Sequence, residues 1–571
     1  MSLMRRSNPH WLLAATLYLF FAVFLIWPIV QVVATGFTGR GGSFTLRYVL
    51  LVFRDPSLVE GLINAAKIAA AVTLLTLLIA MPLAVLSVRC DFPGRALLSG
   101  LLLVPLVLPP FVGALGMKLV LGRFGPLTQI VGGGALGIDW LGRWREAGIV
   151  IVEALHLYPI MLLNLQAALA NIDPAMEQAA ANMGASRWRV FWSITLPLVR
   201  PGLFAGSTLV LIWSFTELGT PLIFDYYTIT PVQVFKRITD IADNPLPYAL
   251  VVVMLAASVM LYVVGKVLLG RSYGAGGTRA SVAAVPHRLR GAQAAGAVAA
   301  FVLVAFLAML PHLAVVLTSL SSTGAWYKSL LPASLTLAHF RDALIDEMAF
   351  PSIVNSIRYA LLATCLALAV GMAAAVVIVR SNLPGRWIID ALSMLPLAVP
   401  GLILAFGYLA ISIKLKQTLG TAAPAWLDVQ RNPLVLLVIA YAARRLPYVV
   451  RSTVAGLEQT PRDLELAAAN IGAGRLTVLR RITVPLIMAN LIAGGLLAFA
   501  FAMLEVSDSL ILAQRPGYYP ITKAILELVN RLGDGIYIAS ALGVWAMVLL
   551  TLTILSASAL LGRRLGAIFR M

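Results

Sequence analysis

The chain has few charged residues, few cysteines and few histidines for its length of 571 residues. Charged residues make up 12% of the sequence and hydrophobic residues 60%, which excludes an ordinary soluble domain. The two cysteines, Cys90 and Cys365, predict no disulfide framework, and the five histidines show no ligand spacing, so no resident metal and no cofactor are expected. The G-x-x-x-x-G-K-[ST] phosphate loop and paired acid–base residues with catalytic spacing are also missing. We therefore expect a protein that is not an enzyme and does not bind ATP in the usual way.

Long apolar runs are what the sequence has in abundance. A run of about 18 or more apolar residues can cross the hydrocarbon core of a bilayer as a helix. Such runs lie near residues 11–35, 62–88, 97–121, 148–169, 202–223, 247–269, 295–320, 352–379, 388–411, 433–450, 488–512 and 536–561. We predict an all-α polytopic membrane protein with about twelve transmembrane helices, six in each half of the chain.

The net charge of +19 has two explanations, binding to nucleic acid and orientation in a membrane. The basic residues are spread over short loops and form no single patch, so no nucleic-acid partner is expected. Lys and Arg are more frequent in the segments that face inward if the N-terminus is inside, which predicts that both termini are cytoplasmic. The stretch at 11–33 follows Arg5 and Arg6 as in a signal peptide, but its length favours a retained first span.

One polar segment occurs twice. The first copy, Glu177–Ala185, reads EQAAANMGA, and the second copy, Glu465–Ala473, reads ELAAANIGA, with every residue 288 positions from its partner. Each copy is followed by the sequence Ile-Thr-x-Pro-Leu. Further matches, such as Asn64 with Asn355 at an offset of 291, extend the repeat over most of the chain.

The repeat predicts two halves of the same orientation, because an even number of spans returns the chain to the same side. We expect a first half at 1–270 and a second half at 292–571, related by a pseudo-two-fold axis along the membrane normal. The segment 271–291 is basic and rich in Gly and Ala, and it is expected to be a flexible cytoplasmic linker.

The doubled segment predicts a helix–turn–helix on the inner face. Three consecutive alanines favour a helix, Gly184 suits the left-handed position that ends it, and Ser186 can cap a second short helix. Small side chains on the first helix would let another protein approach closely, with Glu177 and Arg187 as flanking charges. The alternative is an ordinary amphipathic connection between spans, against which the second copy argues.

The doubled segment resembles the EAA signature of permease subunits in binding-protein-dependent ATP-binding cassette importers. The resemblance covers nearly the whole chain and implies the type I importer fold in a bacterial inner membrane. Two cytoplasmic ATP-binding subunits and an outer-side, periplasmic solute-binding protein are the implied partners. The residues implied to carry the ATPase contact are Glu177, Ala179, Ala180, Gly184 and Arg187, with Glu465, Ala467, Ala468, Gly472 and Arg475 in the second copy.

The signature is not complete. The family usually has Glu six residues before the Gly, where this chain has Gln178 and Leu466, and both copies place Glu one residue earlier. This departure puts the usual salt bridge to the ATPase in doubt, although the shape of the loop is expected to survive.

Among fused double permeases, this chain most closely resembles those for ferric iron in its length. The stretches at 108–113 and 243–245 also look like that group. Related fused permeases serve thiamine or 2-aminoethylphosphonate, and these cargoes stay open. A secondary transporter of the major facilitator type is a further alternative, because it also has two six-span halves.

Several polar residues fall inside the apolar spans, where an ionisable group is costly unless it is paired or wetted. Glu217 and Glu505 match at an offset of 288 and are candidates to face one another across a translocation path, where two acids would suit a cationic substrate. His156 and Arg444 match in the same way beside prolines and are candidates to line the path. For all four residues, a structural role in the helix bundle is the open alternative.

The third span of each half contains prolines that break a helix. They are Pro105, Pro109 and Pro110 in the first half and Pro396 and Pro400 in the second. Gates or pivots and static kinks are both open interpretations.

Overall fold

The computed structural model describes residues 9–39, 42–107, 110–122, 125–126, 128, 144–241, 244–269, 286–326 and 329–561. Pro109, Asp243 and most of the proposed linker, residues 271–285, lie outside the described residues. Helices make up nearly all of the described structure. The one sheet found among the described residues consists of two short parallel strands, in which Cys90 pairs with His287 and Asp91 with Arg288.

The elements of the first half are α1 (Pro9–Phe21), η1 (Ala22–Ile26), α2 (Trp27–Gly36), α3 (Arg47–Arg54), α4 (Pro56–Arg89), β1 (Cys90–Asp91), α5 (Arg95–Leu101), α6 (Val104–Val107), α7 (Pro110–Val120), α9 (Arg145–Ala170), α10 (Pro174–Asn182), α11 (Arg187–Val190), η2 (Phe191–Thr195), α12 (Leu196–Phe215), α13 (Gly219–Ile223), α14 (Thr230–Lys236), η3 (Ile238–Asp240) and α15 (Leu246–Leu269).

The elements of the second half are β2 (His287–Arg288), α16 (Gly291–Leu320), α17 (Ala338–Ile345), α18 (Ala349–Arg380), α19 (Arg386–Ala398), α20 (Gly401–Leu419), η4 (Gly420–Ala422), η5 (Ala425–Leu427), α21 (Leu434–Gln459), α22 (Asp463–Asn470), α23 (Arg475–Val478), η6 (Leu479–Thr483), α24 (Val484–Leu486), α25 (Met488–Met503), α26 (Ser507–Leu512), η7 (Pro516–Tyr518), α27 (Ile521–Val529) and α28 (Gly535–Leu561).

The membrane-crossing helices follow the predicted order. Among the described residues, nine helices are long and apolar enough to cross a membrane, or eleven if each of two bent pairs is one span. The pairs occupy the third and eleventh predicted spans, and the second pair bends by 76° between residues 475–486 and 488–503. α21 covers the tenth predicted span, but Arg444, Arg445 and Arg451 interrupt its apolar sequence, so it is not among the nine.

The prolines of the spans act in two different ways. The ninth predicted span is divided, because α19 ends at Ala398, Pro400 is extended with ψ of 135° and α20 begins at the next residue. By contrast, α9 and α21 continue through Pro159 and Pro447. Neither of these two prolines therefore ends its helix.

The first helices of each half pack against the other half. α1 and α2 contact α18, α19 and α20, and α16 contacts α5 and α7. Tyr18 donates a hydrogen bond to the carbonyl oxygen of Gly385 at 3.0 Å, and Tyr408 donates to that of Phe24 at 2.5 Å. This exchange ties residues from opposite ends of the sequence into one bundle.

Two glycines permit the exchanged helices to approach closely. A Cβ atom on Gly116 would lie 1.7 Å from the carbonyl oxygen of Pro311 in α16, and one on Gly407 would lie 2.7 Å from that of Pro28 in α2. The two glycines are 291 positions apart, so they hold the same place in the repeat. Small residues let helix backbones meet in a membrane, where packing drives association.

An ion pair fixes the corner between α17 and α18. Asp346 accepts hydrogen bonds from the backbone N–H groups of Met348 and Ala349, both at 2.9 Å, and its carboxylate lies 2.6 Å from the guanidinium of Arg531. Partial burial alone would raise the pKa of Asp346, but the bonds from Arg531 and the two N–H groups hold this pKa below its ordinary value of 3.8.

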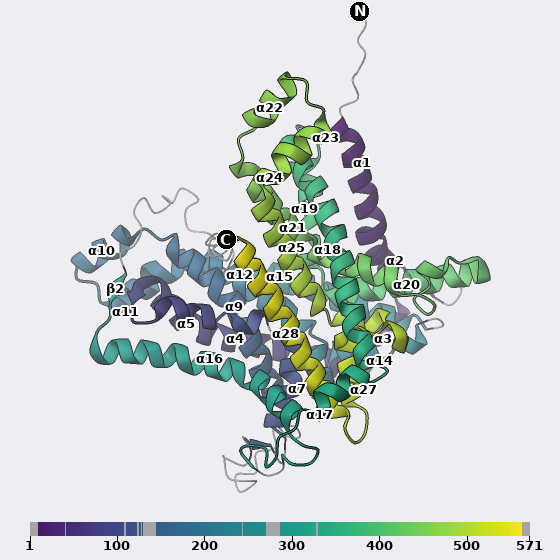
Figure 1. Cartoon of the computed structure of the whole chain (residues 1–571), viewed down its shortest axis with the longest axis horizontal. Helices are drawn as coiled ribbons and strands as arrows, with labels where there is room; N and C mark the ends of the chain where they lie inside the picture. The colour runs from purple at the N-terminus through teal and green to yellow at the C-terminus, as the bar shows by residue number, and fades with distance from the viewer. Residues whose placement is uncertain are drawn as a thin grey trace, which may run out of the picture.

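Figure 1 shows how the two halves spread. The helix α10 lies at the left edge of the view and α22 at the top, so the two copies of the doubled segment occupy separate corners. The short helices α3, α14, α17 and α27 gather at the lower right, at the end of the bundle remote from both. The two copies of the doubled segment thus lie apart from one another, and both lie away from these four short helices.

Candidate functional site

The two copies of the doubled segment fold in the same way. α10 ends in a turn in which Gly184 has a φ of +83°, and its N–H donates to the carbonyl oxygen of Ala181 at 2.9 Å. α22 ends in the equivalent turn, in which Gly472 has a φ of +88° and its N–H donates to the carbonyl oxygen of Ala469 at 3.0 Å. A positive φ costs glycine little and other residues more. The predicted left-handed stop is therefore present in both copies.

The second short helix also forms in both copies. In the first, α11 begins after Ser186, whose side chain accepts a hydrogen bond from the N–H of Arg189 at 3.3 Å. This bond confirms the predicted cap. Gly474 holds the equivalent place before α23 and has no side chain to supply one. Each short helix then runs into a π-helical turn, η2 or η6.

The glutamate of each copy is held within the chain. A carboxylate oxygen of Glu177 lies 3.1 Å from the guanidinium of Arg89, the last residue of α4, and accepts a hydrogen bond from the hydroxyl of Thr195 at 2.7 Å. The pair is mostly buried, with the two side chains 21% and 17% exposed. Glu177 thus links α10 to the end of α4 and to η2.

The second copy repeats this three-residue link. Glu465 lies 3.2 Å from Arg380, the last residue of α18, and accepts a hydrogen bond from Thr483 at 3.1 Å. Arg380 also donates to the carbonyl oxygen of Thr460 just before α22. Because the same three groups meet in both halves, the link belongs to the repeated unit.

Large apolar side chains project from both copies into solvent. Met183 and Ile471, 288 positions apart, are each 87% exposed, and the matched pair Trp188 and Leu476 is 71% and 67% exposed. Their exposure costs free energy in water unless another surface covers them. The same apolar positions are therefore exposed in both copies.

The other candidate residues of these segments surround the projections. Ala179 and Ala467 are exposed, Ala180 is half-buried and Ala468 is buried. Arg187 and Arg475 are exposed at the first position of α11 and α23. The small and basic side chains thus lie next to the apolar ones, while the glutamates face inward.

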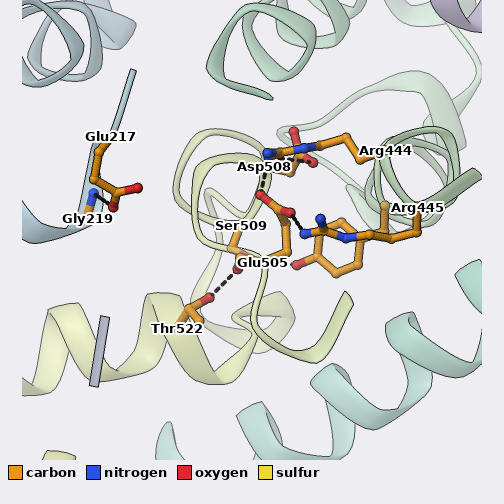
Figure 2. Close-up of polar contacts among 9 residues, drawn as sticks. Glu217, Gly219, Arg444, Arg445, Glu505, Asp508, Ser509 and Thr522 are labelled. Atoms are coloured by element: carbon orange, nitrogen blue, oxygen red, sulfur yellow. Dashed lines mark hydrogen bonds and ion pairs between the residues drawn. The ribbon is translucent and has the colours of Figure 1, made fainter. Parts of the chain in front are cut away.

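The central polar site lies where α21 meets the segment after α25. Glu505 is ion-paired with both Arg444 and Arg445 of α21, and Asp508 lies 3.8 Å from Arg444 (Figure 2). Thr522 donates a hydrogen bond to the backbone oxygen of Glu505 at 2.8 Å. Two buried carboxylates and two arginines therefore compensate one another.

Glu217 is held differently. Its carboxylate accepts hydrogen bonds from the backbone N–H groups of Gly219 at 2.9 Å and Thr220 at 3.3 Å, so it caps the short helix α13. Figure 2 shows it apart from the arginine cluster. Both glutamates nevertheless line one cavity of about 140 Å³, together with His156 and Arg444. All four candidate path residues are thus gathered at one place in the bundle.

A glycine makes room for the arginine of this cavity. A Cβ atom on Gly401, the first residue of α20, would lie 1.9 Å from a guanidinium nitrogen of Arg444. The break in the helix at Pro400 therefore opens the space that the charged side chain fills. Pro396 and Pro400 also line the cavity.

Comparison with known proteins identifies the family. The sequence model for binding-protein-dependent transport system inner membrane components matches residues 76–274 and again residues 366–566, together well over half of the chain. The chain belongs to this family. It is an ATP-binding cassette permease in which the family unit occurs twice.

Several relatives share long alignments with the permease. The ferric transport system permease protein FbpB of Actinobacillus pleuropneumoniae is 26% identical over 92% of this chain and 74% of its own length. A putative FbpB of Haemophilus influenzae is 25% identical over 87% of this chain and 76% of its own length. The molybdenum transport system permease protein ModB of Escherichia coli is 36% identical over 30% of this chain and 74% of its own length.

Membership of the family confirms the expected all-α, multi-pass membrane architecture with helical spans in two repeats. A multi-pass protein of the inner membrane follows from the same match. Among the described residues, no group of three His, Cys, Asp or Glu side chains is placed to hold a metal ion.

Sequence reasoning missed the partners of the doubled glutamates. Arg89 and Arg380 end the second span of each half at an offset of 291, and Thr195 and Thr483 lie in the repeated Ile-Thr-x-Pro-Leu sequence. The repeat itself was therefore a signal for both. Sequence reasoning also missed Glu153, a buried acid that accepts a hydrogen bond from Ser214.

Proposed function

We propose that this permease forms the complete transmembrane pathway of an ATP-driven, binding-protein-dependent importer. The two doubled segments are its contacts with two cytoplasmic ATP-binding subunits, one for each copy. The main support is that two segments 288 residues apart share the same turn, the same internal link and the same exposed apolar positions. A connection with no partner would have no need of either the rigidity or the exposure.

The internal link supports this assignment because a docked ATPase subunit must transmit its movement from the doubled segment to the membrane-spanning helices. A force applied to α10 passes through Glu177 to the end of α4 and through Thr195 to η2, which leads directly into α12. The side chains that would touch the ATPase are then Met183, Trp188 and their matched residues. Glu177 and Glu465 would hold each segment in place, and the exposed side chains beside them would contact the ATPase.

The proposed orientation follows from the same contacts. If α10 and α22 face the cytoplasm, the end that carries α3, α14, α17 and α27 faces outward, where a solute-binding protein would deliver cargo. Both chain termini would be cytoplasmic, in agreement with the distribution of Lys and Arg. The proposed halves remain 1–270 and 292–571, with 271–291 as the cytoplasmic linker.

Transport would proceed by alternating access. The central cavity of about 140 Å³ is too small for a broad channel, and the broken helices around it allow the walls to move as separate pieces. Closure of the ATPase subunits would bring α10 and α22 together and open the opposite end. The states would exchange as rigid bodies biased by ATP and by the binding protein.

Ferric iron is the first candidate cargo, because the FbpB relatives align with most of this chain. Molybdenum is the second candidate, because ModB shares a higher identity over the family unit and because two arginines face the central cavity. ATP hydrolysis is assigned to the separate subunits, so the permease itself is not the enzyme.

Substitution of the two turn glycines tests the docking proposal. Gly184→Val and Gly472→Val place a β-branched residue at a φ above +80°, where it is strained, so each turn should reorganise. We expect loss of co-purification with the permease's ATPase subunit, with normal membrane insertion. Gly533→Val is the matched control, because Gly533 has a φ of +85° and equally open space. Retained ATPase binding in the double variant would refute the proposal.

A further inference from the structure

A second cavity lies between the two halves at the end remote from α10 and α22. It has a volume of about 820 Å³ and takes residues from α14 and η3 of the first half and from α20, α26 and α27 of the second. Figure 1 places α14 and α27 at the lower right, opposite the two doubled segments. In the proposed orientation this cavity is on the outer side.

The charged side chains that line this cavity are all basic. Lys236, Lys416 and Lys523 come from three different helices, and no described Asp or Glu is among the lining residues. Gln417, Gln430 and Gln514 add amide groups to the same walls. Ammonium and amide N–H groups are the donors that bind anions.

The acids behind the lysines do not cancel this charge. Glu527 lies 2.9 Å from Lys523, and Asp428 is shared between Lys416 at 3.8 Å and Arg431 at 3.5 Å. Lys236 instead lies 3.3 Å from the centre of the Tyr227 ring. A third acid, Asp240, accepts a hydrogen bond from the wall residue Thr239 at 3.1 Å. The four bases Lys236, Lys416, Lys523 and Arg431 thus exceed the three acids Glu527, Asp428 and Asp240 by one charge.

The short helix α26 separates the basic cavity from the central one. Its first residue, Ser507, lines the central cavity, whereas Leu510 and Ile511 line the basic cavity. On the far side of α26 stand Arg444 and Arg445, which also line the central cavity. A solute that crosses at α26 would therefore pass from the lysine side chains to a cavity in which the two arginines are paired with Glu505.

We propose that the basic cavity receives an anionic cargo, either a small oxyanion or a metal ion carried in an anionic chelate. A bare multivalent cation would be repelled by the lysines at the first wall that it meets, whereas an anion would be attracted there. The inference rests on the proposed importer function, because only an importer takes cargo from this end of the bundle.

Charged thiol reagents measure the electrostatic potential in the cavity whatever the cargo is. The full chain, with Cys90→Ser and Cys365→Ser, would carry Thr239→Cys on the cavity wall and be reconstituted in nanodiscs. We expect anionic methanethiosulfonate ethylsulfonate to react faster than its cationic trimethylammonium analogue, after correction for their rates with a free thiol. Lys236→Gln should lower this ratio on the order of ten-fold, since one positive charge on the same cavity wall acts on the two reagents in opposite directions.

Two controls make the result specific. Lys67→Gln removes an exposed lysine that lines a different groove, and should leave the ratio unchanged. A cysteine at exposed Ser57 should show no response to Lys236→Gln. Faster reaction of the cationic reagent at Thr239→Cys, or a ratio that ignores the lysines, would overturn the proposal.

Protection of the same thiol separates the two forms of cargo. Sodium molybdate and ferric citrate at millimolar concentration would each be compared with sodium chloride at equal ionic strength. Protection by molybdate supports a free oxyanion, protection by ferric citrate supports an anionic chelate, and protection by neither overturns the cargo assignment. ATPase binding is measured separately with the glycine variants, so a failure of the importer proposal can be told apart from a failure of this one.

Discussion

The link between Glu177, Arg89 and Thr195 predicts a measurable coupling between the doubled segment and the end of α4. We would replace Arg89 by Gln, Glu177 by Gln, and both together. Glu177→Gln keeps an oxygen that can accept from Thr195, so it removes mainly the charge. The double-mutant cycle then isolates the energy of the ion pair from the other effects of each change.

The magnitude follows from the geometry of the pair. A hydrogen bond to a charged group contributes about 1.5–3 kcal/mol to stability, and an exposed ion pair contributes about 0–1 kcal/mol. The N···O distance is 3.1 Å and both side chains are mostly buried, but neither is fully so. We therefore expect a coupling energy of about 1–2 kcal/mol.

Amide hydrogen exchange over α10 measures the change in the local stability of this helix. The dissociation constant for the ATPase subunit measures the resulting change in binding. If the ordered segment is the form that binds, a coupling of about 1–2 kcal/mol appears as roughly 5- to 30-fold in the dissociation constant. The pair of Arg380 with Glu465 gives an independent repeat of the experiment in the second copy. Strictly additive single changes in both copies would refute the reasoning.

The exposed pair of Arg95 with Asp91 supplies the matched control. Its groups are 3.9 Å apart and the side chains are 32% and 56% exposed. Since solvent screens such pairs, Arg95→Gln should change neither exchange in α10 nor ATPase affinity by a measurable amount.

Three further predictions concern stability in detergent or nanodiscs. Gly116→Ala puts a Cβ 1.7 Å from a backbone oxygen of α16, so it should lower stability to heat by about 1–3 kcal/mol, whereas Gly100→Ala, with open space around it, should not. Glu505→Gln leaves two arginines short of a partner and should destabilise by about 3–5 kcal/mol, more than Glu217→Gln, which weakens only a helix cap; equal losses would contradict the site as described. The pKa of Asp346 lies below 3.8 in the folded protein, so its contribution is present above pH 3.8 and is lost as the pH falls through the lower folded value. Asp346→Asn should therefore lower stability at pH 7 and reduce the loss in acid, and an unchanged acid profile would argue against the ion pair.

The fold could be predicted from the sequence because hydrophobic length and repetition are both local signals. The twelve predicted apolar runs fall on helices, of which nine, or eleven with the two bent pairs, are long and apolar enough to cross a membrane among the described residues. The 288-residue offset identified the doubled segment before any contact was known. The left-handed turns at Gly184 and Gly472 could be predicted as well, since a helix-forming run followed by glycine specifies its own end.

The exchange of first helices between halves could not be predicted in the same way. It depends on contacts such as that between Gly116 and Pro311, which are almost 200 residues apart and carry no shared pattern. Small residues in a helix predict that another helix can pack closely against it, but they do not identify that other helix. Only the packed bundle decides between partners of equal apolar character.

The central site departs from the symmetry that the sequence indicates. Glu217 and Glu505 hold matched positions, yet their environments differ because the neighbouring matched residues differ. His156 stands where the second half has Arg444, and Thr220 stands where it has Asp508. Consequently the second half supplies the ion pairs, while the first half holds its glutamate by backbone N–H groups. Movement of the helices within each half, by the same amount in both, would therefore break strong electrostatic contacts in the second half and only a helix cap in the first. The physical expectation is that the first half yields before the second when the cavity opens.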